Sequence, residues 1–558
     1  MSTEDEDSLS ESVGPHINTI ERLSGKYGSL MDSVRRRAPE PLKCSLGCGG
    51  KNCKYCNPGK FAEDDMAIRG LYSHWITKDV LATSRPIGEF MERYNITNQF
   101  KSFGIKSIIN LQTAGEHSSC GPGLHESGFS YDPQEFMDNG VFFYNFGWDD
   151  YGVRSLQFLL DMVKVMAFAI KQGKVAVHCH AGKGRTGVLI ACYLIYSQRM
   201  DGDNAVHYIR QKRPGSVQTS TQVEVCQQFA QYLIPLRMIF SASDPRAYPF
   251  TLGQFLNRQK LMLHGYEARE LKYKPKIIYV IWKRLLSLAH DKDYKFDLEE
   301  DNYDIMYQMS PRAFQEMRDA MDSTCSSVES ISQGNSSTLG SSRYRDNSSA
   351  SDTSSISDSE ATRKPVIEKK MSILLSKDGR SSESDCEVAE GVARALAFNK
   401  LGKRSGMSPE QESASLQLQQ RINSLQENLN ASNASWDLLV TENDPLFLAS
   451  LMWSWFLHLK VSAMTGEDVQ SLVDAENPAA EFKRLPKGLY HTIDFMLSTL
   501  IKFPSIPSKV EEAVLGRICE VLTFSVREMD SSVTLKKTLK KCLISIVDHK
   551  RTRRKIKP

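Results

Sequence analysis

Between about residues 61 and 240, some stretches have the pattern of hydrophobic residues typical of strands and others have the pattern typical of helices. Short runs rich in β-branched and aromatic residues predict strands, and they lie at 71–86, 105–111, 141–148 and 174–178. Longer stretches at 87–103 and 155–172 carry apolar residues at helical spacing, and Gly173 is a typical residue to end the second of them. This strand–helix alternation predicts an α/β fold, with a central, mostly parallel sheet and helices on both faces.

The rest of the chain divides by composition. Its polar and Ser-rich parts are too poor in apolar residues to form a core and are predicted to be disordered, whereas other parts carry helical patterns. The predicted organisation is a disordered N-terminus at 1–40, a Cys-rich loop at 41–60, the α/β domain at 61–240, a helical extension at 241–320, a Ser-rich disordered linker at 321–410, a helical interaction region at 411–550 and a basic tail at 551–558.

Composition excludes several classes of protein. Among 558 residues, 41% are hydrophobic and the net charge is only +3, so no global field for nucleic acid is expected. The longest apolar run, at 446–457, is too short to span a bilayer. The acidic N-terminus does not resemble a secretory signal, and twelve cysteines fit a reducing cytosol better than a disulfide framework. We therefore predict a cytoplasmic protein without a transmembrane segment.

The stretch 174–196, KVAVHCHAGKGRTGVLIACYLIY, contains the candidate chemistry. A short apolar strand is followed by a loop with three closely spaced glycines and then by a helix that is apolar on almost every side. Such a loop collects backbone N–H groups at a helix N-terminus and predicts an anion site. Cys179 and Arg185 lie in this loop. The amides, the helix dipole and Arg185 would bind a phosphate and stabilise a thiolate, which predicts nucleophilic attack on phosphorus.

The run His178-Cys179-x-x-Gly182-x-x-Arg185-Thr186-Gly187 resembles the signature of the protein tyrosine phosphatase superfamily, in its dual-specificity branch. The chain is most similar to the protein tyrosine phosphatase domain-containing family, over about residues 44–264 and more faintly over the last hundred. The resemblance implies the cysteine phosphatase fold and no cofactor. It implies Cys179 as nucleophile, Arg185 as phosphate binder and Thr186 as the hydroxyl that assists the leaving thiolate. The phosphate-binding loop would comprise His180, Ala181, Gly182, Lys183, Gly184 and Arg185, supported by His178.

A leaving oxygen needs a proton, and two adjacent acids are candidates for its donor. Asp149 and Asp150 follow Trp148 in a loop directly after a predicted strand. The family places its acid on a mobile loop here, and the resemblance favours Asp150 over Asp149. The family's usual proline is missing from this loop. A solvated acidic turn is the alternative.

Two residues of the segment 210–222 also match the family. By this match Gln222 would orient the hydrolytic water, with a plain polar helix residue as the alternative. Arg213 would tie the loop to the sheet.

The substrate prediction rests on the variable residues of the loop. Lys183 matches phosphoinositide-directed phosphatases, which carry a second lysine where this chain has His180. These two residues would raise the local positive potential, or Lys183 would be a solvated rim charge. We predict a dual-specificity phosphatase of phosphorylated proteins, with phosphoinositides as the alternative substrates and a non-catalytic phospho-binding scaffold as the alternative function. The family resemblance also implies a centrosomal or ciliary role, and the C-terminal helices are predicted to bind protein partners.

The Cys-rich segment leaves two alternatives open. Cys44, Cys48, Cys53 and Cys56 could enclose a zinc ion, but all four lie within thirteen residues rather than in two separated pairs. The alternative is a loop that packs on the catalytic domain, and no metal is assigned among the site residues. In the C-terminal region, Asp444-Pro445 predicts the start of a helix whose Trp453 and Trp455 are core residues. The basic stretch at 550–557 is predicted to be a solvated terminus.

Overall fold

The computed structural model describes residues 39–290, 382–398, 409–524 and 531–556. Its sheet has five strands in the order β1-β2-β5-β3-β4, and only β1 runs antiparallel to its neighbour. The strands are β1 (Ser73–Trp75), β2 (Val80–Thr83), β3 (Ile105–Asn110), β4 (Phe142–Asn145) and β5 (Lys174–His178). Each lies inside a run of the sequence that predicts a strand, and the sheet is mostly parallel as expected.

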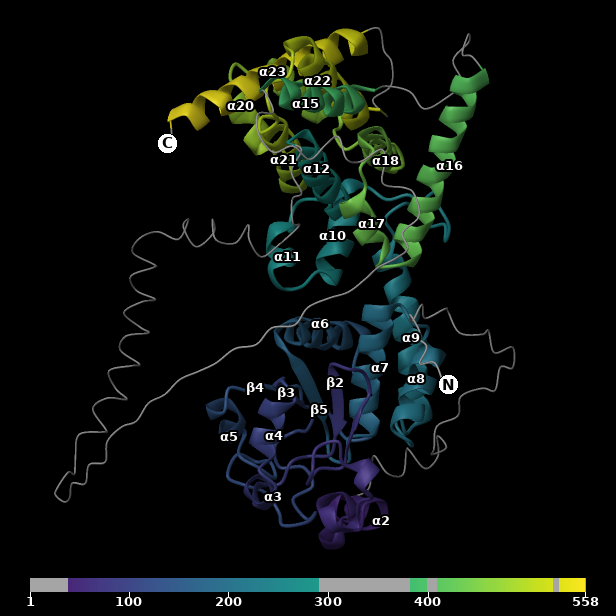
Figure 1. Ribbon diagram of the computed structural model, residues 1–558, viewed down its shortest axis with the longest axis vertical. Helices are drawn as coiled ribbons and strands as arrows, with labels where there is room; N and C mark the ends of the chain where they lie inside the picture. The colour runs from purple at the N-terminus through teal and green to yellow at the C-terminus, as the bar shows by residue number, and fades with distance from the viewer. Residues whose placement is uncertain (1–38, 291–381, 399–408, 525–530, 557–558) are drawn as a thin grey trace, which may run out of the picture. The chain divides into compact units, whose positions relative to one another are not determined.

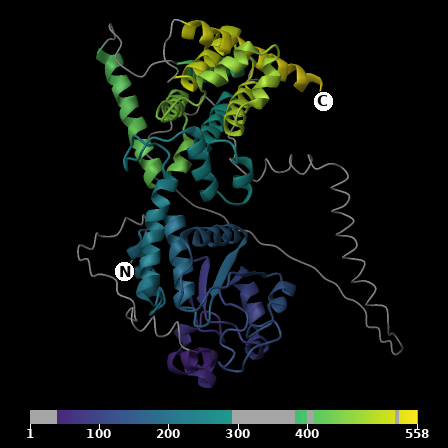
Figure 2. The ribbon, with the colours of Figure 1, turned by 180° about the vertical axis from the view of Figure 1, so that it is seen from behind.

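The central strands β2, β5 and β3 are buried on both faces of the sheet, because their alternate residues enter different cores. In β5, Val175 and Val177 belong to one hydrophobic cluster and Ala176 to the other. The first face is covered by α6 (Leu156–Gln172), α7 (Gly184–Gln198), α8 (Gly202–Lys212) and α9 (Ser220–Arg237). The second is covered by α3 (Gly88–Arg93), α4 (Ile96–Ser102) and α5 (Pro133–Asp138). Figures 1 and 2 show these two groups of helices on opposite sides of the sheet, which confirms the predicted fold class.

Local chemistry explains where the helices that surround the site begin and end. Ser155 accepts a hydrogen bond from the Phe158 amide at the start of α6, and Gly173 follows the last residue of that helix. Thr219 and Gln222 form a reciprocal capping box at the start of α9. Helix α7 begins at Gly184 and is buried over most of its length, so it runs through the core directly behind the loop.

The chain continues into helices that pack beyond the sheet domain. They are α10 (Leu252–Met262), α11 (Gly265–Glu270) and α12 (Lys276–Ala289). Residues 241–251 of the predicted helical extension are not helical, the stretch from Leu252 to Ala289 forms these three helices, and residues 291–320 of that prediction lie outside the described residues. The prediction of a disordered N-terminus at 1–40 falls almost wholly outside them as well.

The C-terminal region is helical, as the pattern predicts. It contains α16 (Pro409–Ala431), α17 (Ser435–Thr441), α18 (Pro445–Leu457), α19 (Gly466–Asp474), α20 (Pro478–Glu481), α21 (Lys487–Leu500), α22 (Ser508–Leu522) and α23 (Ser531–Ile556). Asp444 caps α18, with Pro445 in the first turn. Trp453 and Trp455 are buried, and their indole N–H groups donate to the carbonyls of Leu396 and Ile239. Both tryptophans are core residues, as predicted.

Two predicted segments differ from the structure. Residues 382–397, inside the range expected to be a disordered linker, form α15 (Ser382–Ala397), because Ala389, Val392, Ala393 and Leu396 lie at helical spacing and are buried. The rest of the predicted linker lies outside the described residues, apart from Phe398 and the first two residues of α16 (Pro409–Ala431). The basic stretch at 550–557 does not form a free tail over its described part, because it continues α23. There Lys550 pairs with Asp494 at 2.6 Å and Arg551 with Glu511 at 2.7 Å.

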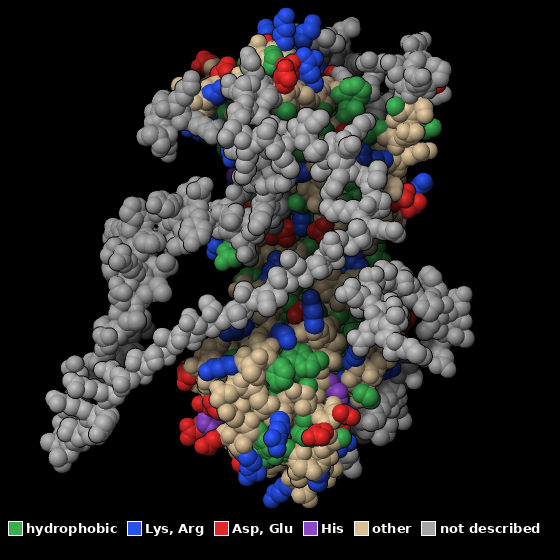
Figure 3. Space-filling view, in the orientation of Figure 1, with side chains coloured by type: hydrophobic (Ala, Val, Ile, Leu, Met, Phe, Trp, Pro, Cys, Tyr) green, Lys and Arg blue, Asp and Glu red, His purple; other side chains and the backbone are tan. Residues whose placement is uncertain are grey.

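The surface drawn in Figure 3 carries mixed charge. Basic and acidic side chains are interspersed on this face of the described residues, without one broad basic area. This distribution agrees with the small net charge of the sequence. None of the helices within the described ranges combines the length and apolar character needed to cross a membrane.

The C-terminal helices are tied to the sheet domain by a buried amide. The sheet domain and the chain from Val388 onward belong to one compact unit. Asn430 of α16 accepts hydrogen bonds from the amides of Ile239 and Phe240 at 2.9 and 3.0 Å, and it donates to the Phe240 carbonyl at 2.8 Å. Asn430 is only 4% exposed, and Ile239 and Phe240 are buried as well. Bulk water therefore cannot replace these hydrogen bonds to the backbone.

We therefore expect Asn430→Ala to lower the free energy of unfolding by about 2 kcal/mol or more, because it leaves buried backbone groups unpaired. Urea denaturation of the full chain measures this loss. The matched control is Asn428→Ala on the exposed face of the same helix, which should change the stability little. Equal effects of the two substitutions would contradict this account of Asn430.

Candidate active site

The loop at the carboxyl end of β5 has the conformation of an anion cradle. It begins at Cys179, which is buried, and leads into α7 at Gly184. Gly182 adopts a φ of +65°, and a Cβ atom there would lie 2.0 Å from the carbonyl oxygen of Thr83 in β2. Only glycine satisfies both conditions, because other residues are strained at this φ and the clash is with backbone. The loop is thus pressed against the neighbouring strand.

The carbonyl groups of the loop are held from outside. His180 O accepts from the Arg85 amide at 3.0 Å, and Lys183 O accepts from the Val217 amide at 3.1 Å. Arg213 donates to Ala181 O at 3.0 Å and to Gly182 O at 2.6 Å. The N–H of a trans peptide points away from its C=O, so fixing these carbonyls outward turns the following amides toward the centre of the loop. The loop is thereby arranged to bind an anion.

Arg213 is a structural part of this arrangement. It is fully buried, and besides the two loop carbonyls it donates to the Tyr72 carbonyl at 3.1 Å and lies 2.6 Å from His74 Nδ1. Burial lowers its pKa to about 10, which still leaves it charged at neutral pH. These contacts are the ones expected of a residue that ties the loop to the sheet.

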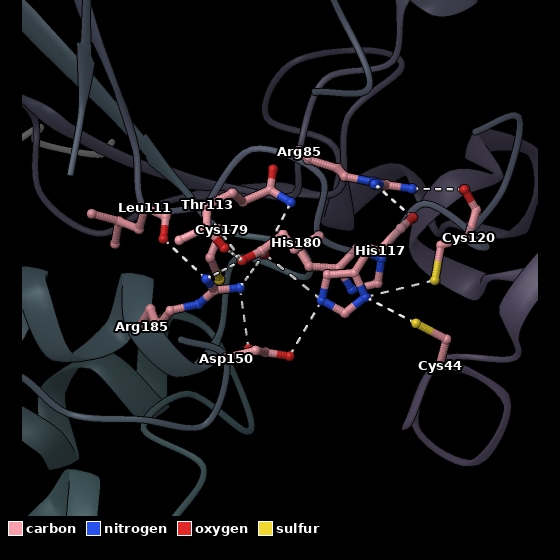
Figure 4. Close-up of polar contacts among 12 residues, drawn as sticks. Cys44, Arg85, Leu111, Thr113, His117, Cys120, Asp150, Cys179, His180 and Arg185 are labelled. Carbon is pink, nitrogen blue, oxygen red and sulfur yellow. Dashed lines mark hydrogen bonds and ion pairs between the residues drawn. The ribbon is translucent and has the colours of Figure 1, made fainter. Parts of the chain in front are cut away.

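Arg185 is the buried charge at the centre of the site (Figure 4). Its Nη1 donates to the carbonyls of Leu111 and Trp148 at 3.0 and 2.7 Å. The Glu116 carboxylate accepts from both terminal nitrogens, at 2.9 and 2.6 Å, a bidentate pairing that fixes the guanidinium plane. Burial alone would lower the pKa of Arg185, but the carboxylates of Asp150 and Glu116 raise it, so the guanidinium stays charged.

Asp150 reaches the same guanidinium from the loop after β4. One of its oxygens lies 3.2 Å from Arg185 Nη2, and the other lies 3.3 Å from His117 Nε2. Burial favours the neutral acid, but Arg185 and His117 outweigh it and hold the pKa of Asp150 well below its usual range. Asp149, the other candidate acid, is exposed and takes part in no ion pair among the residues that the structure describes. The geometry therefore brings Asp150 into the site and not Asp149.

Several buried polar atoms around the loop have no protein partner within the described ranges. They are Arg185 Nε, Thr186 Oγ1 and Gln222 Nε2. The Gln222 side chain lies beside Gly184, since a Cβ built on that glycine would be 3.3 Å from Nε2. Its Oε1 accepts from the Gln218 amide at 2.9 Å, so only the amide nitrogen is left over. Unpaired buried donors next to an anion cradle indicate a site arranged for a ligand.

The two histidines beside Cys179 have different surroundings. His178 is buried at the end of β5, where Nε2 lies 2.8 Å from the Tyr131 hydroxyl and burial lowers its pKa to about 4. His180 is also buried, at 5% exposure, and its ring stacks on His117 with 3.9 Å between the centroids. Burial lowers the pKa of His180. Its enclosed ring and lowered pKa both count against the expectation that His180 adds positive potential for a polyanionic substrate.

Lys183 is the basic residue of the loop that remains partly exposed. Its Nζ lies over the ring of Tyr72, 5.0 Å from the centroid, and 5.7 Å from that of Tyr55. The aromatic faces hold the ammonium group at the rim of the loop. Both sequence-based roles of Lys183, as a substrate contact and as a rim charge, are compatible with this position.

Three residues that were not predicted from the sequence complete the site, namely Glu116, His117 and Arg85. Glu116 and His117 follow β3, whose carboxyl end lies beside that of β5 in the sheet. Polar residues after neighbouring parallel strands meet at one edge, and this signal could have identified Glu116. Arg85 follows β2 and donates from Nη2 to the Cys120 carbonyl at 2.8 Å.

Comparisons with known proteins show which sequences and structures this chain resembles. The model of the dual specificity phosphatase catalytic domain matches residues 92–231. Protein tyrosine phosphatase domain-containing protein 1 of Danio rerio is 31% identical over 95% of this chain and 94% of its own length. The protein of the same name from Bos taurus is 32% identical over 96% of this chain and 90% of its own. The crystal structure of kinase associated phosphatase is 20% identical over 29% of this chain and 96% of that one, with a TM-score of 0.25.

The Glu116–Arg185 pair gives a prediction about stability. Glu116→Gln would leave the buried guanidinium with less compensating charge, and we expect it to lower the free energy of unfolding by about 3 kcal/mol near neutral pH. Exposed Glu126→Gln is the matched control. Urea denaturation at several pH values measures both variants.

The pH dependence of this effect has a definite sign. Burial raises the pKa of Glu116, but Arg185 outweighs it and holds the pKa below the ordinary value of 4.5. The stabilisation is therefore complete above pH 4.5 and is lost as the pH falls through the folded-state pKa. The difference between the wild type and Glu116→Gln should shrink in acid, and a constant difference would contradict the ion-pair account.

Proposed function

Because the chain belongs to the family of protein tyrosine phosphatase domain-containing protein 1, we propose that it hydrolyses phosphate monoesters on proteins through a phospho-Cys179 intermediate. The observation that carries this proposal is the loop itself. Its carbonyls are held outward around Cys179, and the buried Arg185 next to it has a free Nε donor. The chain is a protein tyrosine phosphatase-type enzyme.

Phosphate binding would begin with an exchange of anions on Arg185. In the structure Asp150 contacts Nη2, and Nε has no partner among the described residues. Together these two nitrogens offer a bidentate edge that fits two oxygens of a phosphate. Glu116 and the carbonyls of Leu111 and Trp148 keep the guanidinium oriented while the exchange takes place.

The same exchange would prepare Asp150 to act as the acid. Its pKa is low because it contacts Arg185 and His117. A bound phosphate removes the first contact and adds negative charge, and both changes raise the pKa of a carboxyl. Asp150 can then hold a proton and deliver it to the leaving oxygen as the Cys179 sulfur–phosphorus bond forms and the phosphorus–oxygen bond breaks.

Hydrolysis of the intermediate would use the remaining polar atoms. Water attacks the phosphorus, its proton passes to the Asp150 carboxylate, and the sulfur–phosphorus bond breaks to release inorganic phosphate. Thr186 Oγ1 is buried and free to donate to the leaving thiolate, and Gln222 Nε2 is free to orient the water. The capping bond through Gln222 Oε1 fixes the amide in this orientation.

Protein substrates are favoured over phosphoinositides by the position of the loop charges. A polyanionic head group would gain from two basic residues beside the phosphate, but His180 is enclosed and only Lys183 lies at the rim. A phosphoinositide phosphatase and a non-catalytic phospho-binding scaffold are the two alternatives. Protein partners of the C-terminal helices and a centrosomal or ciliary role stay predictions from the sequence and the family resemblance.

The first test is release of inorganic phosphate by the full chain, beside Cys179→Ser. The panel contains an aryl phosphate, phosphotyrosine and phosphoserine peptides, and phosphoinositide vesicles. We expect turnover on phosphopeptides, abolished in the variant because an alkoxide does not form in place of the thiolate. Faster turnover of phosphoinositides would replace the substrate assignment, and folded protein without turnover on any substrate would support the scaffold.

The second test separates the two acids by the leaving group. We expect Asp150→Asn to lower kcat by about 10²-fold or more on alkyl phosphates such as phosphoserine, and by less on an aryl phosphate with an acidic leaving group. The matched control, Asp149→Asn, should change both rates little. Equal losses from both substitutions, or a loss independent of the leaving group, would reject Asp150 as the acid.

A further inference from the structure

We propose that Cys48, Cys53, Cys120 and His180 bind a zinc ion, which joins the N-terminal Cys-rich segment to the phosphate-binding loop. The three sulfur atoms and one ring nitrogen all lie within 4.8 Å of one another, and all four residues are buried. Two ligands come from the Cys-rich segment, one from the loop after β3 and one from the residue next to Cys179. This set shares Cys48 and Cys53 with the four cysteines of the N-terminal segment, and it has Cys120 and His180 in place of the other two.

The distances fit a tetrahedral ion. Zinc bonds of about 2.3 Å to sulfur and about 2.0 Å to nitrogen place two sulfurs about 3.8 Å apart and sulfur and nitrogen about 3.5 Å apart. Cys53 Sγ lies 3.6 Å from His180 Nε2, and Cys48 Sγ lies 3.3 Å from Cys120 Sγ. These two pairs lie within about half an ångström of the tetrahedral values, and no pair of ligand atoms is more than 4.8 Å apart, so side-chain adjustments of about 1 Å or less would bring all four to one ion. Three sulfurs and an imidazole in a tetrahedral arrangement favour zinc over oxygen-seeking cations.

The surroundings also suit the charge of such a centre. Zinc with three thiolates and a neutral imidazole carries a net charge of −1. The guanidinium of Arg85 is buried beside it and supplies +1, donating to the Cys120 carbonyl at 2.8 Å and approaching Cys56 Sγ at 3.5 Å. The Arg85 amide holds the His180 carbonyl at 3.0 Å, so one residue orients two ligands.

The backbone brings the two segments together independently of the side chains. The Gly121 amide donates to the Gly50 carbonyl at 3.2 Å, next to Cys120 and between Cys48 and Cys53. A side chain at Gly121 would meet Cys56, since a Cβ built there lies 2.8 Å from the Cys56 Cβ. The Cys-rich segment is therefore closely packed on the catalytic domain, and packing and metal binding are compatible here.

A neighbouring group is incomplete as a zinc site. Cys44, His117 and Cys120 lie within the same separation, but they offer only three ligand atoms and share Cys120 with the first group. Cys44 Sγ lies 3.1 Å from His117 Nδ1. These residues would instead lie beside the ion. His117 also connects the proposed ion to Asp150. Its ring stacks on the ligand His180, and its Nε2 lies 3.3 Å from Asp150 (Figure 4).

The consequence is that the ion would hold the phosphate-binding loop in place. His180 adjoins the proposed nucleophile Cys179, and its stacked neighbour His117 contacts the proposed acid Asp150. The three cysteines would act as positioning residues rather than catalytic ones. Loss of the ion is expected to loosen the loop that carries Cys179.

The test measures the metal content of the full chain, expressed with zinc in the medium and purified without chelator. We expect one zinc per chain in the wild type and in Cys179→Ser, which has lost the proposed nucleophile. Metal content is read separately from turnover, so failure of the phosphatase proposal does not affect this result. Cys53→Ser and Cys120→Ser should lose the zinc.

Two control variants define the ligand set. Cys192→Ala removes a buried thiol of α7 outside the cluster, and Cys44→Ser removes a thiol of the incomplete group. Both should keep their zinc. If Cys44→Ser loses zinc to the same extent as Cys53→Ser, the four-ligand assignment is wrong.

A measurement on the wild type alone covers the case in which a variant does not fold. Exchange of the metal for cobalt should give the visible absorption of a tetrahedral cobalt ion with thiolate ligands. A chelator strong enough to remove the zinc should lower the Tm by several degrees, because an ion that binds only the folded state stabilises it. Metal-free folded protein with an unchanged Tm, or a Cys48–Cys120 disulfide found by mass spectrometry in freshly purified protein, would overturn the proposal.

Discussion

The active-site architecture depends on a single buried cation. Arg185 is fully enclosed at the start of α7, and an uncompensated charge at that depth would be strongly destabilising. The fold compensates it with Glu116 and Asp150 and with backbone carbonyls of the segments that follow β3 and β4. Folding thus draws three loops to one edge of the sheet. The two carboxylates have different attachments, since Glu116 binds the guanidinium at two points and Asp150 at one.

This difference allows one guanidinium to serve both stability and function. The Glu116 contact orients Arg185, whereas the Asp150 contact occupies the edge on which a phosphate would bind. An anion that displaces Asp150 leaves the rest of the network in place. In the proposed mechanism, Arg185 would therefore be held in a paired form before the substrate arrives, and the partner that phosphate displaces, Asp150, would be the group that acts as the acid.

The loop around Cys179 is supported on two sides by buried arginines, through the guanidinium of Arg213 and the backbone amide of Arg85. Arg213 gathers the carbonyls of Ala181 and Gly182 from the side of β1 and β2. Arg85 holds the His180 carbonyl from the side of the Cys-rich segment. The Cys-rich segment therefore packs against a residue that supports the loop around Cys179. A zinc ion at Cys48, Cys53, Cys120 and His180 would extend the same principle, because it fixes the residue next to the nucleophile through its side chain.

The sequence by itself determined the fold class, the strand–loop–helix unit and the two residues at its centre. These features are local, because alternation of apolar residues defines strands and helices, and a glycine-rich loop between them defines an anion site within about a dozen residues. The pair Asp149 and Asp150 followed from its place after a strand, and the choice of Asp150 rested on the family resemblance. The partners of Arg185 and of the cysteines could not be read in this way. Glu116 lies 69 positions from Arg185, and Cys120 lies 72 from Cys48. The sheet order, which sets β3 beside β5, brings Glu116 to Arg185, and the packing of the N-terminal segment on the loop after β3 brings Cys48 to Cys120. Only the tertiary structure encloses the His180 ring beside the cysteines.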